Sequence, residues 1–165
     1  MHLLDFQVHK HLQQQVGRVY SSAYNGEVYN APELRRELEG RGFSFETACD
    51  TEVVLAAYLA WGPGCAEKLN GIFAFAVDDP LEQRTVLCRD RFGVKPLFYT
   101  LREGRLVFAS EIKGLLEFPG VEPVVGPDGL RELFALGPAR TPGCGVFEEI
   151  HELLPGHVAV FDRLG

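Results

Sequence analysis

The segment from Tyr24 to Asn30, Tyr-Asn-Gly-Glu-Val-Tyr-Asn, contains the residues with the clearest chemical potential in this sequence. The side-chain amide of Asn25 and the backbone N–H of Gly26 can both donate to one oxygen. Fixed donors of this kind stabilise the charge of a tetrahedral intermediate, as an oxyanion hole does. Taken alone, the pattern favours an ordinary Asn-Gly turn, so the surrounding sequence has to decide.

Other catalytic and nucleotide-binding motifs are missing from the sequence. It contains no Gly-x-Ser-x-Gly, no Gly-x-x-x-x-Gly-Lys-Ser/Thr and no Gly-x-Gly-x-x-Gly. His2, His9 and His11 could bind a metal, but their irregular surroundings favour solvated histidines. We therefore expect no metal site.

The residue pattern predicts an α+β fold around this segment. A strand from Arg18 to Tyr24 ends at the Asn25-Gly26 turn, and helices begin at the N-caps Asn30 and Asp50. Gly40 and the pair Gly62-Pro63 end these helices. Further strands are predicted at 72–77, 85–88, 97–101, 106–109 and 156–162, and short helices at 111–117 and 128–136. Because the strands are grouped rather than alternating with helices, we expect mainly antiparallel sheet.

Composition restricts the class of protein. The 165 residues suit one domain, and the net charge of −7 argues against nucleic acid or an anionic membrane surface as a partner. No apolar run is long enough to span a membrane. The four cysteines, Cys49, Cys65, Cys88 and Cys144, are too widely spaced for a zinc site or a dense disulfide framework. We expect buried thiols and a cytoplasmic location.

A series of further motifs follows the Asn25 segment in the chain. In order, they are Cys49-Asp-Thr-Glu-Val-Val, Leu69-Asn-Gly-Ile-Phe-Ala-Phe-Ala, Arg89-Asp-Arg-Phe-Gly-Val-Lys-Pro-Leu-Phe-Tyr, Phe108-Ala-Ser-Glu-Ile-Lys, Arg140-Thr-Pro-Gly and Leu154-Pro-Gly-His. In this order and spacing the chain resembles the amino-terminal glutaminase domain of glutamine-dependent asparagine synthetase. That domain is a class II glutamine amidotransferase of the N-terminal-nucleophile hydrolase fold. The resemblance extends from about Arg18 to the end.

The resemblance implies a fold and a set of roles. The fold is a four-layer αββα sandwich of two antiparallel sheets. Asn25 and the Gly26 amide would form the oxyanion hole, and Glu27 and Asp50 would hold the α-amino end of L-glutamine. From the residues alone, Asp50 could equally be a helix N-cap and Glu27 a solvated turn residue.

The remaining motifs are interpreted as scaffold. Phe73, Phe75 and Val77 alternate as a buried strand face does. The charged turn containing Arg89, Asp90, Arg91 and Lys95 is predicted to form a salt-bridge network, and Ser110-Glu111 to begin a helix.

The sequence departs from the family at its start. Family members begin Met-Cys-Gly-Ile, and after removal of Met the cysteine attacks glutamine with its own α-amino group as base. Here His2 follows Met1 and the first cysteine is Cys49, which lacks a free α-amino group. A family arginine that grips the α-carboxylate of glutamine also has no clear counterpart.

We therefore expect an N-terminally truncated domain, with residues 1–17 irregular and residues 18–165 forming an incomplete glutaminase-type domain. Its parent reaction would release ammonia from L-glutamine for ATP-dependent amidation of aspartate. ATP and Mg would belong to a synthetase domain, so this chain would hold no cofactor. Its partners would be L-glutamine and either that domain or another copy of the chain. One alternative is a non-catalytic amino-acid-binding, regulatory or interaction module, and another is a different amidotransferase or a β-lactam- or peptide-cyclising relative.

Overall fold

The computed structural model describes residues 2–3, 11–15, 18–136 and 141–162, with side chains from Val19 onward. Its larger sheet has the strand order β2-β3-β4-β5-β9, and each neighbouring pair is antiparallel. The strands of this sheet are β2 (His11–Gln15), β3 (Arg18–Val28), β4 (Gly71–Asp79), β5 (Arg84–Arg89) and β9 (Val158–Asp162).

The smaller sheet has the order β1-β7-β6-β8. Its strands are β1 (His2–Leu3), β6 (Phe98–Arg102), β7 (Arg105–Ala109) and β8 (His151–Glu152). The pairs β6–β7 and β6–β8 are antiparallel, whereas the short β1 runs parallel to β7.

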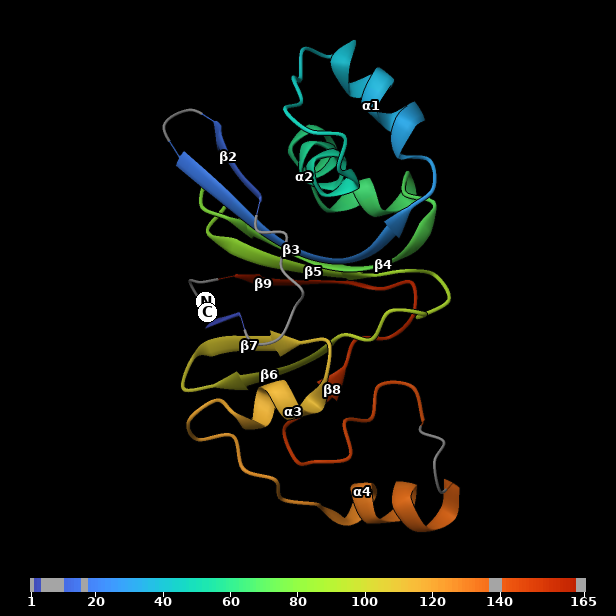
Figure 1. Ribbon diagram of the computed structural model, residues 1–165. Helices are drawn as coiled ribbons and strands as arrows, with labels where there is room; N and C mark the ends of the chain where they lie inside the picture. Colours follow the sequence, from blue (N-terminus) through green and yellow to red (C-terminus); the bar gives the residue numbers. More distant parts are fainter. Residues whose placement is uncertain (1, 4–10, 16–17, 137–140, 163–165) are drawn as a thin grey trace.

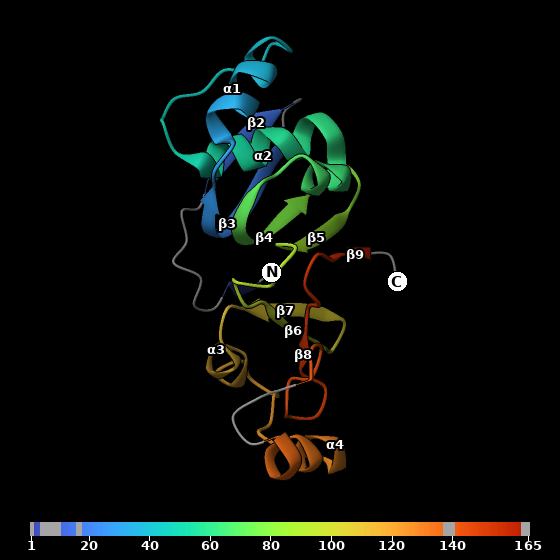
Figure 2. The same ribbon diagram turned by 90° about the vertical axis from the view of Figure 1, so that its right-hand side faces the viewer.

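Helices cover the outer face of each sheet (Figures 1 and 2). On the larger sheet lie α1 (Ala31–Glu39), α2 (Asp50–Trp61) and the 3-10 helix η1 (Gly62–Glu67); beyond the smaller sheet lie α3 (Ile112–Leu116), α4 (Pro127–Arg131) and the π-helical η2 (Glu132–Leu136). The predicted four-layer αββα sandwich is therefore confirmed.

The alternation of large and small residues along β4 separates two cores. Phe73, Phe75 and Val77 are buried against the helices, as predicted. Ala74 and Ala76 point the other way, into the core between the two sheets. Because successive strand side chains face opposite sides, the aromatic side fills the space under the helices and the alanine side allows the second sheet to approach.

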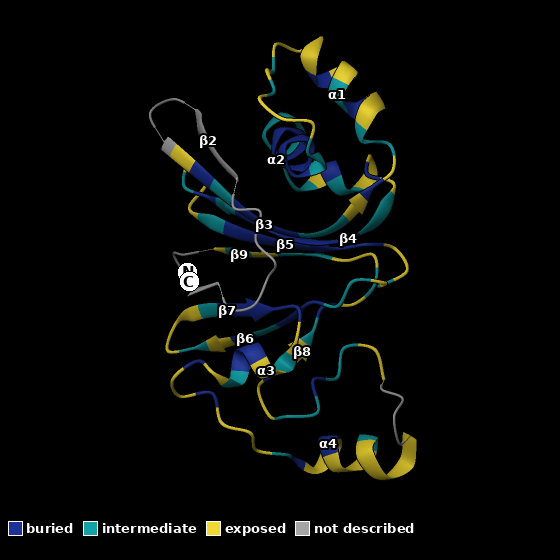
Figure 3. Ribbon diagram, viewed as in Figure 1, coloured by how far each residue is buried: buried dark blue, intermediate teal, exposed yellow. Residues whose placement is uncertain are grey.

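The two helical layers differ in how deeply they are buried (Figure 3). All residues of α2 from Thr51 to Tyr58 are buried, because the helix lies under α1 and on the sheet. Most of α4 and η2 is exposed, including Phe134 at 88%. The predicted helix over 128–136 exists, but its second half is π-helical.

Several local predictions were wrong. The strand does not stop at Tyr24: β3 continues through Asn25 and Gly26 to Val28. Part of the N-terminal segment expected to be irregular forms β1 and β2. Asn30 is the N-cap residue of α1, but its side chain makes no capping hydrogen bond and instead contacts the backbone of Lys68 and Asn70.

Candidate active site

The predicted oxyanion residues lie near the end of β3, paired with β4. Asn25 is in register with Ala74, and Gly26 with Phe73. A Cβ atom at Gly26 would lie 2.2 Å from the Ile72 carbonyl oxygen, and the residue has a φ of 148°. Both the close approach and the backbone conformation require glycine here. The Asn-Gly pair is therefore part of a tightly packed strand and forms no free turn.

Asp50 is brought to the same end of β3 from a different element. It is the first residue of α2, whose N-cap is Cys49, so the predicted N-cap role of Asp50 is wrong. Its Oδ2 accepts hydrogen bonds from the Tyr24 hydroxyl at 2.6 Å and from the Val28 backbone N–H at 3.0 Å. The carboxylate thus binds the strand on either side of Asn25, Gly26 and Glu27.

These contacts change the acidity of Tyr24. Burial of the phenol, reinforced by the hydrogen bond to the Asp50 carboxylate, raises the pKa of Tyr24 well above its ordinary value. The tyrosine therefore stays a neutral donor to Asp50. The second oxygen of Asp50, Oδ1, faces the Cys49 thiol at 3.7 Å, a weak donor.

Asn25 reaches across to the other sheet. Its Nδ2 donates to the hydroxyl of Ser110 at 3.3 Å. Ser110 comes directly after β7 and is 7% exposed. The expected helix start is close, because Glu111 is the N-cap of α3, but Ser110 itself lies before the helix. The sequence interpretation missed this residue as part of the site, and the signal for it was the alternation from Phe108 to Ser110.

Glu27 is exposed and in register with Ile72. It lies between Gly26 and Val28, and the backbone N–H of Val28 donates to Asp50. The structure places Glu27 beside the other predicted residues, and its role in binding stays a prediction.

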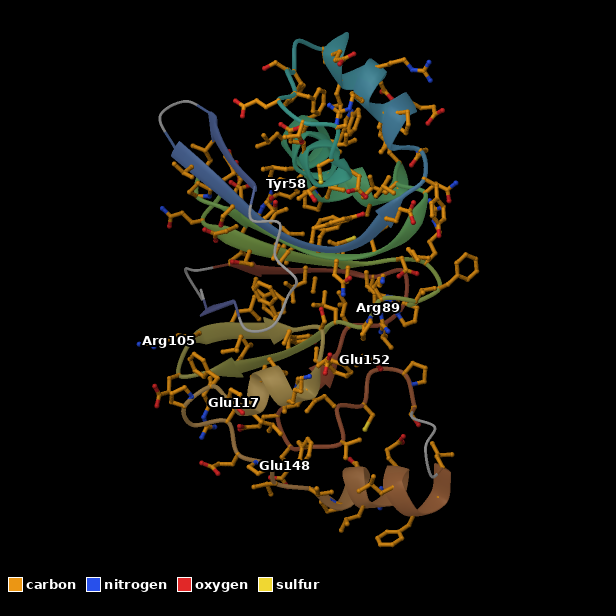
Figure 4. All side chains as sticks on the ribbon, in the orientation of Figure 1. Tyr58, Arg89, Arg105, Glu117, Glu148 and Glu152 are labelled. Carbon is orange, nitrogen blue, oxygen red and sulfur yellow. The ribbon has the colours of Figure 1, made fainter. Side chains whose placement is uncertain are left out.

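The charged turn after β5 is organised mainly by backbone contacts, so the predicted salt-bridge network is only partly present. The Asp90 carboxylate is fully buried and accepts backbone hydrogen bonds from Phe73, Phe92, Val94 and Lys95. Arg89 donates to the carbonyls of Gly93, Lys95 and Leu153. Its ion pair with Glu152, at 3.0 Å, joins the two sheets (Figure 4).

The cysteines differ in their access to this region. Cys65 and Cys88 are buried, and burial raises the pKa of Cys65 to about 12 and that of Cys88 still further. Cys144 lines a cavity of about 640 Å³ beside α4, which Asn25, Gly26, Glu27 and Asp50 do not line. Cys49 is half-buried next to Asp50 and also contacts the Thr51 hydroxyl at 3.2 Å. Of the four, only Cys49 lies beside the predicted site.

The described residues show neither a metal site nor a membrane-spanning helix. They contain no group of three or more histidine, cysteine or acidic side chains placed to hold a metal ion. None of their helices combines the length and apolarity that crossing a bilayer requires. His9 and the side chains of His2 and His11 lie outside the part described.

Comparison with known proteins decides the family. Residues 4–165 match the family described as the glutamine amidotransferase domain. The chain belongs to this family. It is 48% identical over 149 residues to asparagine synthetase [glutamine-hydrolyzing] 3 of Bacillus subtilis, covering 90% of this chain and 24% of that protein. It is also 36% identical to the amidase chyE of Penicillium rubens, covering 82% of this chain and 19% of the relative.

A solved structure supports the amidotransferase fold. The glutamine phosphoribosylpyrophosphate amidotransferase of B. subtilis superimposes with a TM-score of 0.60 at 21% identity. The match covers 93% of this chain and 29% of that one. The chain thus spans about a quarter of the length of these two B. subtilis proteins.

Proposed function

We propose that this amidotransferase domain binds L-glutamine at the end of β3 and is the glutaminase portion of an asparagine-synthetase-like protein. The observation that carries the proposal is the placement of the Asp50 carboxylate, which accepts hydrogen bonds from Tyr24 and Val28. These contacts bring Asp50, from α2, to the strand segment that holds Asn25, Gly26 and Glu27. On this basis we infer that Asn25, Gly26, Glu27 and Asp50, from two elements, form one site.

The charge arrangement suits the α-amino end of glutamine. Both strong donors to Asp50 bind Oδ2, which leaves Oδ1 with the Cys49 thiol as its partner among the described residues. An ammonium group leaving water needs a carboxylate partner, and charged hydrogen bonds are about twice as strong as neutral ones. Oδ1 of Asp50 would supply such a partner, and the exposed Glu27 would add a second negative charge from the β3 segment that this carboxylate contacts.

The other end of the ligand would lie against Asn25 and Gly26. Their donors would bind the side-chain carbonyl oxygen of glutamine and the negative charge that develops on it when a nucleophile attacks. Because Gly26 is fixed by its contact with β4, its N–H is held without reorganisation. In the parent reaction the released ammonia would serve amidation of aspartate in a synthetase domain, which would use ATP and Mg.

These 165 residues are proposed to bind glutamine without hydrolysing it. Cys49 is the one cysteine beside the site, and it has no α-amino group to act as its base. A domain that binds an amino acid and does not react with it could serve as a regulatory module. The choice between a glutaminase portion and such a module depends on whether a nucleophilic cysteine is supplied.

Calorimetric titration with L-glutamine tests the binding site. Asp50→Asn should weaken binding by about 2 kcal/mol or more, roughly 30-fold, because the ammonium loses its charged partner. Asp128→Asn is the matched control, since it removes an exposed carboxylate at α4. Equal affinities for the two variants would remove the basis of the proposal.

An assay for released ammonia tests the absence of hydrolysis. The expected result is no ammonia above the protein-free rate with saturating L-glutamine. Ammonia release that survives Cys49→Ala would reveal a different nucleophile and overturn this part of the proposal. Release abolished by Cys49→Ala would instead make Cys49 the nucleophile.

A further inference from the structure

The inner faces of β3 and β7 change from apolar to polar side chains at the same end of the sandwich. Ala23 of β3 and Phe108 of β7 both lie in the core between the two sheets. Asn25 lies two residues after Ala23, and Ser110 lies two residues after Phe108. Because strand side chains alternate, each polar side chain is on the same face as the apolar one before it. Both faces thus pass from apolar to polar, and the two polar side chains meet at 3.3 Å.

Packing alone does not explain why two polar side chains, Asn25 and Ser110, lie together here. Ser110 is 7% exposed, and burying a hydroxyl costs free energy that a small apolar side chain avoids. Nor does the hydroxyl cap the following helix, since α3 has Glu111 as its N-cap and no side-chain cap hydrogen bond. Within the described residues, the contact that uses the Ser110 hydroxyl is the one with Asn25.

We propose that Ser110 is a positioning residue that orients the Asn25 amide for the carbonyl oxygen of glutamine; this rests on the proposed function. The terminal torsion of an asparagine is broad, so an unrestrained amide samples many orientations. Its NH₂ group carries two donors. The Ser110 hydroxyl accepts one of them and restricts the rotation, and the second donor remains for the ligand.

Binding of two ligands distinguishes this positioning role from a general disruption of the site. L-Glutamine and L-2-aminobutyrate share the α-amino and α-carboxylate groups, and L-2-aminobutyrate lacks the side-chain amide. Ser110→Ala should weaken L-glutamine about fivefold, the effect of one neutral hydrogen bond, and leave L-2-aminobutyrate unchanged. Ser110→Thr keeps the hydroxyl and should restore glutamine affinity. Equal losses for both ligands, or no loss for glutamine, would overturn the proposal.

NMR of the Asn25 side-chain NH₂ group tests the contact without any ligand. The wild-type protein should show a nuclear Overhauser effect between this group and the Ser110 Hβ protons, and restricted rotation about the Cβ–Cγ bond of Asn25, seen as a high ¹⁵N order parameter of Nδ2. Ser110→Ala should lower this order parameter, and Ser110→Thr should keep it high. If glutamine binds but the wild-type contact is missing, the positioning role alone is wrong. If the contact is present but the wild type binds no glutamine, the proposed function fails and this role fails with it.

Discussion

Asp50 and Asp90 are two carboxylates that each join a strand to the segment beside it, but they are used differently. Asp90 is fully buried, and its two oxygens accept four backbone hydrogen bonds within and beside one turn. Asp50 is half-buried, and both of its strong hydrogen bonds fall on one oxygen. A carboxylate whose acceptor capacity is filled internally stabilises the fold, whereas one with an unfilled oxygen can also receive a ligand.

The largest effect is expected at Asp90. Asp90→Asn replaces an acceptor oxygen with an NH₂ group that faces backbone N–H donors in a buried site. Charged hydrogen bonds contribute about 1.5–3 kcal/mol each, so the free energy of unfolding should fall by about 3–5 kcal/mol. Urea denaturation measures it. Asp128→Asn should change stability by about 0.5 kcal/mol or less, because Asp128 is exposed.

A smaller loss of stability is expected at Asp50. The carbonyl oxygen of Asp50→Asn can still accept from the Tyr24 hydroxyl and the Val28 N–H, so only the charge of the acceptor is lost. The free energy of unfolding should fall by about 1 kcal/mol in the same urea experiment. A loss as large as that of Asp90→Asn would break the distinction between a structural and a ligand-binding carboxylate.

A further effect appears only at high pH and concerns Tyr24. Its folded-state pKa is raised above the unfolded value near 10, so the folded state keeps a proton that the unfolded state releases. This stabilisation is fully present below pH ~10 and is lost as the pH rises further, by about 1.4 kcal/mol per pH unit. Stability of Tyr24→Phe should therefore fall less steeply than that of the wild type between about pH 10 and 11.

A matched variant tests that assignment. Tyr29 is an exposed tyrosine five residues away, so Tyr29→Phe should keep the wild-type slope. If both variants have the wild-type slope, Asp50 does not hold Tyr24 as a neutral donor.

Local sequence patterns predicted helices and strands well where a single residue type, such as a turn glycine, determined the backbone conformation. The strands predicted at 97–101 and 106–109 are present as β6 and β7, and Glu103 and Gly104 between them have the positive φ that tight hairpins need. The same reasoning failed at Asn25-Gly26, because the glycine is required by the approach of β4 and not by a turn. A glycine in the sequence does not tell whether a turn or the close approach of another strand requires it.

The predicted binding residues came from family resemblance, and their contacts could not be read from the chain. The Asp50 position looked like a cap because a cap and a ligand-binding carboxylate can both lie at the start of a helix. Ser110 was missed because its partner, Asn25, lies 85 residues away in the other sheet. Pairing across sheets depends on how two strands align in space, which a single sequence pattern does not specify.

Near both described ends of the chain, successive strands belong to different sheets. This order affects which strands can pair while the chain is being synthesised. β8 belongs to the smaller sheet and β9, which follows it, to the larger. A nascent chain can pair β3, β4 and β5 early, but β5 obtains its outer neighbour only after Val158–Asp162 has left the ribosome. Until then β5 presents unpaired backbone groups to other chains. We expect the newly synthesised domain to depend on chaperones until β9 is in place.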